Sequence, residues 1–501
     1  MSAAGQPPIL WLARRLIWLF LGWTALLTGA DADLWGHVRF GLDFLQSWHL
    51  PSIDTYSYAQ DLPWINHEWL SEAIMGGAYG FGGSTGLVVV KAAAVILTYV
   101  LLIGAYSGAP LLVGEAATLF VMWGSLPLTM SVRPQIWTFL LVAAVVRLTR
   151  VSSLPGEQHT TRGLSPWRLL LIPLLFASWV NLHGGWIVGA ALIGLWCAGE
   201  VWERRRLDVK IVGLAAACGL ATLVNPYGWG LWRFIAETVR LSRDDIIEWH
   251  SLWTAPLSDQ LFWLATLAVG AYCAVRKAHR PRWDVLVTLG GLAFASYRVR
   301  RLEPMFMETS LIMLAPAIGA HLAWLSKRLE PRPGPTVAGV RLVNGVLIAA
   351  FTVIVVVAAR THLVCIPPVP PEPDGRVAAL AAHAVPGRVA VPFNWGEYAI
   401  WHFSPRLKVS IDGRRETLYS EERLAVQFDL ERGDPEGLRL LDRERPEYVW
   451  MPTAHDRLLA ALPAHGYRID VQTKESYIAV RQDLARLHLP TREPSGCFPA
   501  P

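Results

Sequence analysis

The sequence predicts a mostly α-helical, polytopic membrane domain followed by a small α/β domain, and three observations support this prediction. Long stretches such as Ala92–Ile103 and Leu342–Ala359 contain no charged residue. Residues 375–492, in contrast, have the charge content of an ordinary soluble protein. The Lys and Arg residues that precede them lie in short clusters between the apolar stretches, as membrane topology requires.

About eleven apolar stretches are candidates for membrane-spanning helices, because a helix needs about 20 apolar residues to cross a bilayer. They cover residues 9–29, 86–106, 110–130, 134–150, 168–183, 186–202, 210–225, 260–275, 284–298, 303–325 and 342–360. With the N-terminus in the cytoplasm, basic clusters such as Arg204–Arg206 fall inside. An odd number of spans then predicts a multi-pass protein of the bacterial inner membrane with a periplasmic C-terminal domain. Cleavage of the first segment as a signal peptide is the alternative.

The predicted organisation has four parts: a membrane domain over 1–360, a Pro-rich linker over 361–375, a soluble periplasmic α/β domain over 376–490 and a tail over 491–501. The first outer loop, about 30–85, contains two amphipathic helices at 36–49 and 66–79. In the soluble domain, strands at Val389–Pro392, Leu407–Ile411, Tyr448–Met451 and Tyr477–Val480 alternate with helices at Trp395–His402, Glu421–Glu431 and Asp456–Ala464. Cys365 and Cys497 both fall outside, where a disulfide between them is one option.

Several classes of function are excluded or disfavoured. The net charge of +5 does not indicate a nucleic-acid partner, because the basic residues follow the membrane topology. The sequence contains no Walker-type loop, no G-x-G-x-x-G after a strand and no H-E-x-x-H. It therefore argues against an ATP-driven pump, a dinucleotide enzyme and a zinc protease of the common type.

The strongest candidate for chemistry is the segment Asp31-Ala-Asp33-Leu-Trp-Gly-His37, directly after the first span. A carboxylate at a membrane–water boundary is partly desolvated, which suits it to act as a base. Asp31 and Asp33 could also hold a divalent cation through oxygen ligands, and His37 is a candidate for substrate binding. The alternative is that these acids simply end a helix and meet water.

A second cluster, Asn66-His67-Glu68-Trp69-Leu70-Ser71-Glu72, follows in the same loop. Glu68 and Glu72 are four residues apart and share one helical face. His67 and Glu68 are candidates for substrate binding, and Glu68 could join a metal site. The alternative is a solvated face of an interfacial helix.

Further polar residues recur at the predicted outer ends of the spans. The substrate-binding candidates among them are Arg133, His183, Glu248, Arg298 and Arg301. An anionic lipid phosphate would need guanidinium partners, because Arg gives persistently charged, bidentate contacts. For any single Arg the alternative is interface anchoring or a structural ion pair. Polar groups at membrane depth are costly unless they serve a cavity, which favours a functional role for the set.

The order of these motifs resembles that of a group of bacterial membrane proteins related to the polytopic glycosyltransferases of the GT-C fold, which use lipid-linked sugars. The resemblance covers about 30–310. Its motifs are Asp31-x-Asp33-Leu-Trp-x-His37, Pro51-x-x-Asp54-x-x-Ser57, Trp64-x-x-His67-Glu68-Trp69-Leu70, Arg133-Pro134-Gln135, Asn181-Leu-His183-Gly-Gly, Asn225-Pro-Tyr227-Gly and Glu248-Trp249.

The resemblance implies the roles of particular residues. An acidic residue of the first outer loop acts in that superfamily as base toward the acceptor or helps to organise a metal, and this role falls on Asp33 first and Asp31 second. The donor is a polyprenyl-phosphate or polyprenyl-diphosphate sugar, whose phosphate would contact Arg133, Arg298 and Arg301. The sequence leaves open whether a cofactor is needed; a divalent cation, Mg or Mn, is one option, and Asp31, Asp33 and Glu68 are its candidate ligands.

The C-terminal part resembles the tail of the same group in Asn394-Trp395-Gly396-x-Tyr398 and Ile411-Asp412-Gly413-Arg414. These segments are distantly similar to the Trp-Trp-Asp-Tyr-Gly region of oligosaccharyltransferase catalytic subunits. Two departures stand out. Glu397 lies between Gly and Tyr, so an acceptor-sequon function is not carried over, and Gly36 stands where the group has an aromatic residue.

We therefore expect a GT-C-like membrane domain that transfers a sugar from a polyprenyl-linked donor to a glycan, lipid or protein acceptor on the outer face. Two alternatives stay open. A transporter or flippase of lipid-linked glycans would use the same polar residues but should show inverted repeats. A non-catalytic membrane assembly protein would tolerate replacement of Asp33.

Overall fold

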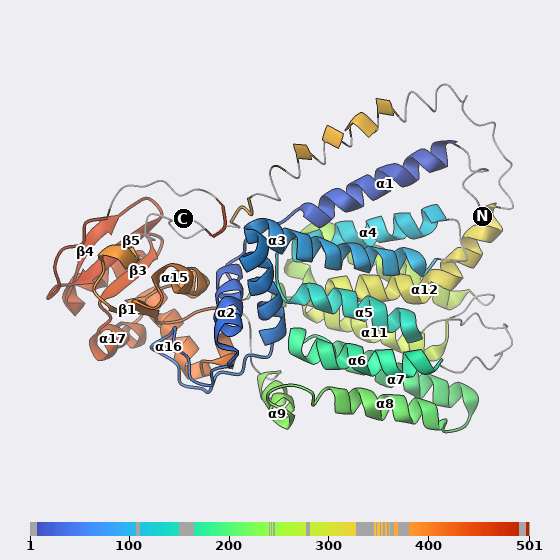
Figure 1. The fold of residues 1–501 in the computed structure, drawn as a ribbon, viewed down its shortest axis with the longest axis horizontal. Coiled ribbons are helices and arrows are strands. Elements are labelled where there is room, and N and C mark those ends of the chain that lie inside the picture. Colours follow the sequence, from blue (N-terminus) through green and yellow to red (C-terminus); the bar gives the residue numbers. More distant parts are fainter. Residues whose placement is uncertain are drawn as a thin grey trace. The chain divides into compact units, whose positions relative to one another are not determined.

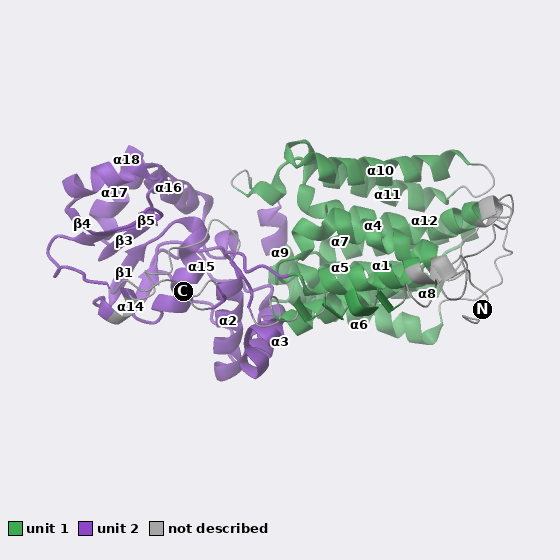
Figure 2. Ribbon diagram, turned by 90° about the horizontal axis from the view of Figure 1, so that it is seen from above, with its two compact units in different colours: residues 1–27, 88–232, 242–363 green, residues 28–87, 233–241, 364–501 purple. Residues whose placement is uncertain are grey.

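The computed structural model divides the chain into two compact units (Figures 1 and 2). Unit 1 comprises residues 1–27, 88–232 and 242–363, and unit 2 comprises 28–87, 233–241 and 364–501. The structure describes residues 8–106, 111–149, 165–239, 241, 243, 246–276, 281–326, 345–346, 348–350, 352–353, 356–357, 360, 365–368, 380–489 and 497–499.

Unit 1 is built from helices that run side by side. They are α1 (Pro8–Leu26), the second part of α3 (Trp69–Gly104), α4 (Leu111–Thr129), α5 (Gln135–Thr149), α6 (Pro166–Leu182), α7 (Trp186–Arg204), α8 (Val209–Ala221), the first part of α9 (Trp229–Thr238), α10 (Leu257–Val275), α11 (Trp283–Arg298) and α12 (Glu303–Ser326). Short 3-10 turns at Ile247–Trp249 (η2), Leu252–Thr254 (η3) and Arg300–Leu302 (η5) connect some of them. Helix α5 packs against α6, α7 and α12, which makes it the centre of this unit.

Helices occupy the predicted spans from 9–29 to 303–325, so the predicted mostly helical class is confirmed. Among the described residues, four helices are long and apolar enough to cross a membrane by length and composition: Trp69–Gly104, Leu112–Thr129, Trp186–Arg204 and Arg300–Leu322. Shorter apolar helices cover Gln135–Thr149, Pro166–Leu182 and Val209–Ala221. The predicted span 342–360 falls mostly outside the described residues.

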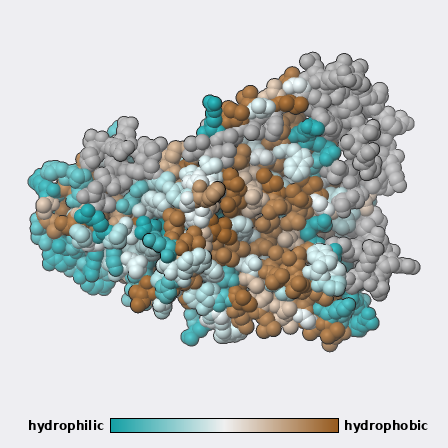
Figure 3. All heavy atoms as spheres, viewed as in Figure 1, coloured by the Kyte–Doolittle hydropathy of each residue, from teal (hydrophilic) through white to brown (hydrophobic). Residues whose placement is uncertain are grey.

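The surface of unit 1 is apolar where a lipid environment would meet it. Side chains such as Ile96, Leu170 and Phe294 are exposed, and Figure 3 shows apolar side chains over much of the visible face of these helices, whereas the visible face of the sheet region is largely hydrophilic. Exposed apolar residues of this kind would be costly in water. The described part of the chain therefore has the surface of a multi-pass membrane protein.

A buried lysine joins two of the helices. Lys91 in α3 is 1% exposed, and its ammonium group donates to the carbonyl oxygens of Ala25, at 3.3 Å, and of Leu27. These carbonyls lie at the C-terminal end of α1, where helix carbonyls lack partners within the helix. The lysine therefore stabilises the end of α1 from inside the unit.

Unit 2 combines the first outer loop with the C-terminal part of the chain (Figure 2). The loop contributes α2 (Leu34–Ser47) and the first part of α3, which kinks at Gly83, where φ is +57°. A five-stranded mixed sheet has the order β2-β1-β3-β5-β4, with strands β1 (Gly387–Ala390), β2 (Leu407–Val409), β3 (Tyr448–Pro452), β4 (Tyr467–Gln472) and β5 (Ser476–Arg481). Its helices are α14 (Leu380–His383), α15 (Gly396–Phe403), α16 (Glu421–Arg432), α17 (Pro435–Glu444) and α18 (Asp456–Ala461), and 3-10 turns cover Phe393–Trp395 (η8), Arg415–Thr417 (η9) and Leu462–His465 (η10).

The predicted α/β character of this part is confirmed. The four predicted strands correspond to β1, β2, β3 and β5, and the three predicted helices to α15, α16 and α18 with η10. Strand β4 and helix α17 were not predicted. The signal for β4 was present in the sequence, because Tyr467-Arg468-Ile469-Asp470-Val471-Gln472 alternates apolar and polar residues with period two.

The expected membrane domain, residues 1–360, includes the first outer loop, whereas the structure groups this loop with the sheet. Hydrogen bonds between the loop and the sheet domain explain the difference. The backbone N–H of Tyr58 donates to the Val409 carbonyl and that of Val409 donates to the Tyr56 carbonyl, both at 3.0 Å. These two hydrogen bonds form one parallel β-bridge between Ser57 and Val409, at the edge strand β2 of the sheet. Asp61 accepts hydrogen bonds from the backbone N–H and the hydroxyl of Ser420, at 2.8 and 2.5 Å. The loop is therefore part of the sheet domain. The expected linker and tail, 361–375 and 491–501, lie mostly outside the described residues.

A buried arginine fastens the loop to the sheet domain. Arg414 donates to both carboxylate oxygens of Asp54 at 2.8 and 3.0 Å and to both oxygens of Asp412 at 2.7 Å. Its guanidinium group lies 4.8 Å from the ring centre of Phe40 and 4.6 Å from that of Trp64. Two bidentate carboxylates and two aromatic faces satisfy a charge that would otherwise be expensive to bury.

The C-terminus is fixed to the same unit. Cys365 and Cys497 form a disulfide, and the Phe498 ring lies within 6 Å of the rings of Trp35, Tyr79 and Trp401. The Trp35 indole N–H also donates to the Pro499 carbonyl at 3.3 Å. Cys197, Cys218 and Cys273 are buried free thiols.

Replacing Arg414 by Met should destabilise unit 2, because Asp54 and Asp412 would remain as two uncompensated buried carboxylates. We expect a loss of about 3–5 kcal/mol in unfolding free energy, measured by denaturant unfolding of the purified full chain in detergent. The control is Arg439→Met, since Arg439 and its partner Glu436 are 70% and 62% exposed. Equal stability of the two variants would contradict the fastening role of Arg414.

Candidate functional site

The two acids that follow the first span have different structural roles. Asp31 is buried, and its Oδ1 accepts a hydrogen bond from the Asp33 backbone N–H at 3.2 Å. Asp33 is half-buried at the N-cap position of α2. Asp31 therefore shapes the turn that begins the helix, while Asp33 presents its carboxylate at the positive end of the helix dipole.

Glu397, in α15, shares its surroundings with Asp33. A Cβ atom built on Gly413 would lie 2.6 Å from Oδ1 of Asp33 and 2.9 Å from Oε1 of Glu397, so both carboxyl groups border the same small space. A Cβ atom on Gly36 would lie 2.1 Å from Oε2 of Glu397. Glycine at both positions is therefore what makes room for the Glu397 side chain.

Position 36 and Glu397 are complementary in size. The Glu397 carboxyl group fills the space that a side chain at position 36 would need. One side of Asp33 is therefore lined by a carboxyl group that a larger residue at position 36 would displace.

The charges around Asp33 are set by burial and by neighbours. Burial, reinforced by the negative charges of Asp33 and Asp412, raises the pKa of Glu397 well above its usual range. Burial lowers the pKa of His37, but the hydrogen bond and charge of Glu72, together with Glu68 and Asp33, outweigh it and raise the pKa to about 9. The surroundings of Asp33 thus favour the protonated form of both His37 and Glu397.

Glu72 connects the two clusters that the sequence singled out. One of its carboxylate oxygens lies 3.2 Å from Nδ1 of His37, and the other accepts a 2.5 Å hydrogen bond from the Asn66 side-chain amide. Glu72 is 5% exposed. Its position four residues after Glu68 was noted in the sequence, but its role as the partner of His37 was not predicted.

The other predicted residues of unit 2 form a separate pair. Nε2 of His67 lies 3.6 Å from Oε1 of Glu68, and the His67 ring lies 5.7 Å from the Phe234 ring. Both side chains are partly exposed. They stay candidates for substrate binding.

In unit 1, two of the predicted arginines share one carboxylate. Arg133 donates to Oε1 of Glu248 at 2.8 Å, and a nitrogen of Arg301 lies 4.0 Å from Oε2 of the same residue. All three side chains are between 19% and 27% exposed. Glu248 therefore holds two guanidinium groups near one another, and guanidinium groups can bind an anionic ligand in a bidentate manner.

His183 and Arg298 differ from this pair. Nδ1 of His183 lies 2.7 Å from the Thr138 hydroxyl and accepts a hydrogen bond from the Gly185 backbone N–H at 3.0 Å. Because Trp179 also donates to Thr138, at 2.9 Å, His183 belongs to a buried network that closes the end of α6. Arg298, the last residue of α11, is exposed.

The arrangement of the His, Cys, Asp and Glu side chains bears on the predicted divalent cation. Among the residues that the structure describes, no group of three or more His, Cys, Asp or Glu side chains is arranged to hold a metal ion. Asp31, Asp33 and Glu68 therefore do not form a ligand set there, and the chemistry below involves the side chains of the chain alone.

Sequence reasoning missed three residues that this region depends on: Glu397, Asp54 and Arg414. A charged residue among apolar neighbours, as in Ile411-Asp412-Gly413-Arg414, is a signal of a buried ion pair. The partner of Arg414, Asp54, is 360 residues away, and no local pattern indicates so distant a contact.

Known proteins resemble this chain in structure only. No protein-family model and no curated protein sequence matches it. The oligosaccharyltransferase AglB of Archaeoglobus fulgidus, in complex with an inhibitory peptide and a dolichol-phosphate, aligns with a TM-score of 0.55 at 12% identity, over 95% of this chain and 75% of its own. ArnT of Cupriavidus metallidurans, bound to undecaprenyl phosphate, aligns with a TM-score of 0.52 at 12% identity, over 94% of this chain and 97% of its own.

A third structure, the mycobacterial arabinofuranosyltransferase AftD, aligns with a TM-score of 0.50 at 14% identity, over 94% of this chain and 41% of its own. At these identities the likeness shows the fold. The chain therefore has a fold similar to that of GT-C glycosyltransferases across most of its length, as the sequence motifs predicted.

The raised pKa of His37 predicts a pH dependence of stability. Its ordinary pKa is 6.5 and its pKa here is about 9, so protonated His37 stabilises the folded state fully below pH 6.5, and this contribution is lost as the pH rises through 9. We expect His37→Gln to lower the unfolding free energy by about 3 kcal/mol at pH 6 and by little above pH 9. A deficit that is independent of pH would show that His37 is not held protonated by Glu72.

The complementarity of Gly36 and Glu397 predicts a double-mutant effect. Gly36→Ala should cost about 1–3 kcal/mol, because its methyl group would overlap the Glu397 carboxyl group. In a Glu397→Ala background the same change should be neutral or stabilising, since alanine favours a helix over glycine by up to about 1 kcal/mol. Unfolding of the four proteins in one detergent measures the coupling, and additive effects would refute it.

Proposed function

We propose that this chain is a membrane glycosyltransferase that moves a sugar from a polyprenyl-phosphate-linked donor to an acceptor on the outer face of the membrane. The observation that carries the proposal is the Asp33 carboxylate at the start of α2, in a chain with a GT-C-like fold, near His37 and Glu397, whose pKa values are both raised. Two of the proteins that share the fold are named as complexes with dolichol-phosphate and undecaprenyl phosphate.

In the proposed reaction Asp33 acts as the general base. Its carboxylate takes the proton of the acceptor hydroxyl as the hydroxyl oxygen bonds to the anomeric carbon of the donor sugar. The bond between that carbon and the phosphate oxygen breaks, and the polyprenyl phosphate leaves with the bonding electrons. The N-terminal end of α2 and the protonated His37 side chain place positive charge near Asp33.

The leaving phosphate needs a positive partner, and Arg133 and Arg301 are our candidates. Both contact Glu248, Arg133 at 2.8 Å and Arg301 at 4.0 Å. A phosphate that develops further negative charge as it departs would be stabilised by pre-positioned guanidinium groups, whose orientation Glu248 fixes. Arg298 is the third candidate, because it is exposed at the end of α11.

The disulfide between Cys365 and Cys497 supports the outward placement of the C-terminal residues. Disulfides form and persist in the periplasm and are rare in the cytosol. The same unit contains Asp33, so the reaction would occur on the outer side of a bacterial inner membrane.

Sugar transfer in vesicles with radiolabelled polyprenyl-phosphate sugars tests the proposal. Asp33→Asn keeps the side-chain size and removes the base, so transfer should fall by at least about 100-fold. Asp442→Asn is the matched control, because Asp442 is 59% exposed in α17. Circular dichroism and binding to the donor lipid should be unchanged in both variants.

Each other result would contradict the proposal in a distinct way. Transfer that survives in Asp33→Asn would remove Asp33 from the mechanism. Movement of the intact donor across the vesicle without sugar transfer would indicate a flippase, and neither activity with any donor would indicate a non-catalytic assembly protein.

A further inference from the structure

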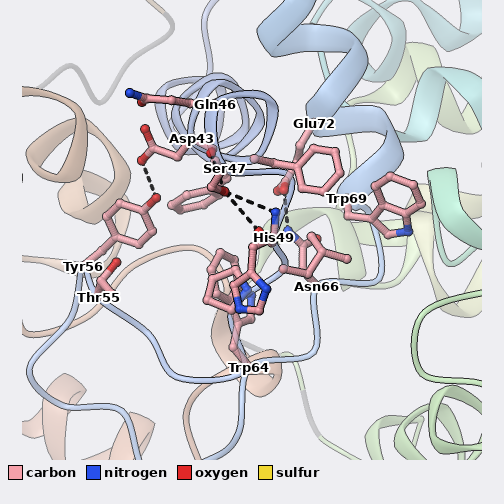
Figure 4. Close-up of a pocket in the computed structure, with 14 residues that line it drawn as sticks. Asp43, Gln46, Ser47, His49, Thr55, Tyr56, Trp64, Asn66, Trp69 and Glu72 are labelled. Atoms are coloured by element: carbon pink, nitrogen blue, oxygen red, sulfur yellow. Dashed lines mark hydrogen bonds between the residues drawn. The ribbon is translucent and has the colours of Figure 1, made fainter.

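The first outer loop encloses a cavity that the proposed chemistry does not use (Figure 4). It has a volume of about 310 Å³ and lies among the C-terminal half of α2, the loop that follows and the start of α3. Five aromatic side chains line it: Phe40, Phe44, Tyr56, Trp64 and Trp69. This volume is at the small end of the range for ligand sites, which runs from about 300 to 1,000 Å³.

Polar groups lie between the rings at the cavity wall. Asp43 accepts a 2.5 Å hydrogen bond from the Tyr56 hydroxyl, and Glu72 accepts one from Asn66. Ser47 and His49 lie at the exposed side. Figure 4 shows the labelled carboxyl, amide and hydroxyl groups gathered around the same space as the rings. The wall therefore offers flat apolar faces together with several hydrogen-bond acceptors.

The charges of the lining select the class of ligand. Asp43 and Glu72 are acidic, and none of the fourteen residues lining this cavity is Lys or Arg. Each acid is already paired, Asp43 with Arg39 at 2.8 Å and Glu72 with His37 at 3.2 Å, so the wall has no cation in excess to hold a phosphate or a carboxylate. A wholly apolar ligand would bring no hydrogen-bond partner to polar lining side chains such as Gln46 and Thr55. An uncharged, polyhydroxylated ligand satisfies both conditions.

We propose that this cavity binds one neutral sugar ring of an oligosaccharide. The axial C–H groups of a pyranose form a flat apolar face that packs on aromatic rings, whose faces are electron-rich. Its hydroxyl groups donate outward to the carboxylates of Asp43 and Glu72 and to the Asn66 carbonyl. One ring fits the volume, and the exposed side at Ser47 and His49 leaves room for the chain of rings to continue.

The position of the cavity along α2 indicates which ring of the acceptor is bound. This part of the inference rests on the proposed function. Asp33 begins α2 and Asp43 lies ten residues further on, which corresponds to about 15 Å along a helix. That distance is several sugar rings, so the bound ring is not the reacting one. It is a distal ring of an acceptor that has more than one sugar.

Binding of neutral oligosaccharides to the purified full chain in detergent tests this inference. The probes are glucose-, mannose- and N-acetylglucosamine-based oligosaccharides of one to four rings, with uronate-containing oligosaccharides of equal length for comparison, and the readout is saturation-transfer NMR. We expect at least one neutral series to bind. Its affinity should not depend on the acceptor hydroxyl group to which the sugar is transferred. Uronate oligosaccharides should bind at least tenfold more weakly.

Two variants and two controls locate the site. Trp69→Leu removes a stacking face, and Ser47→Trp fills the exposed side without truncating a core residue; each should weaken binding about tenfold. Trp48→Leu is the matched control, because Trp48 is 76% exposed and does not line the cavity. Asp33→Asn should keep full binding while it abolishes transfer.

The outcomes separate this inference from the proposed function. Binding that both variants weaken and both controls keep supports the sugar site, even if no transfer is found. Absence of binding by every neutral oligosaccharide at millimolar concentration overturns it, even if transfer is found. Equal binding of neutral and uronate oligosaccharides, or binding that Trp69→Leu and Ser47→Trp leave unchanged, also overturns it.

Discussion

The bidentate contacts of Arg414 with Asp54 and Asp412 are the interaction on which unit 2 depends most. They join a residue of the first outer loop to a segment that follows a sheet strand, under the rings of Phe40 and Trp64. Because the guanidinium group is buried, either acid alone would leave part of its charge unsatisfied. The loop is therefore held as a structural part of the sheet domain, and α2, which carries Asp33, is held with it.

This fastening explains how the C-terminal residues can contribute to a site that begins in the first loop. Gly413 immediately precedes Arg414, and the space beside it is bordered by Asp33 and Glu397. Glu397 in turn needs glycine at position 36, so this side of Asp33 is shaped by the loop and the C-terminal part together.

The sequence predicted what depends on local periodicity and on motif order. The predicted apolar stretches correspond to α1, α3 to α8 and α10 to α12, and the predicted strands and helices of residues 376–490 to elements of the sheet domain. The fold is similar to that of GT-C glycosyltransferases over most of the chain. What it did not predict depends on contacts between distant residues. Three contacts join segments more than 340 residues apart: Tyr58 with Val409, Asp54 with Arg414 and Gly36 with Glu397. No local sequence pattern around either residue of such a pair indicates its partner. His183 shows the converse case, because a histidine in a motif proved to be part of a buried hydrogen-bond network.

The central claim is that the chain breaks the bond between a sugar and a polyprenyl phosphate and forms a new glycosidic bond. The most direct measurement follows both bonds at once: purified chain, a donor with a ¹³C-labelled anomeric carbon, and an oligosaccharide acceptor, with the labelled carbon observed by NMR and the lipid products by mass spectrometry. The account predicts one polyprenyl phosphate released for each new glycosidic carbon, with neither product formed when the acceptor is omitted. An anomeric carbon that stays attached to its phosphate, with every acceptor tried, would contradict it.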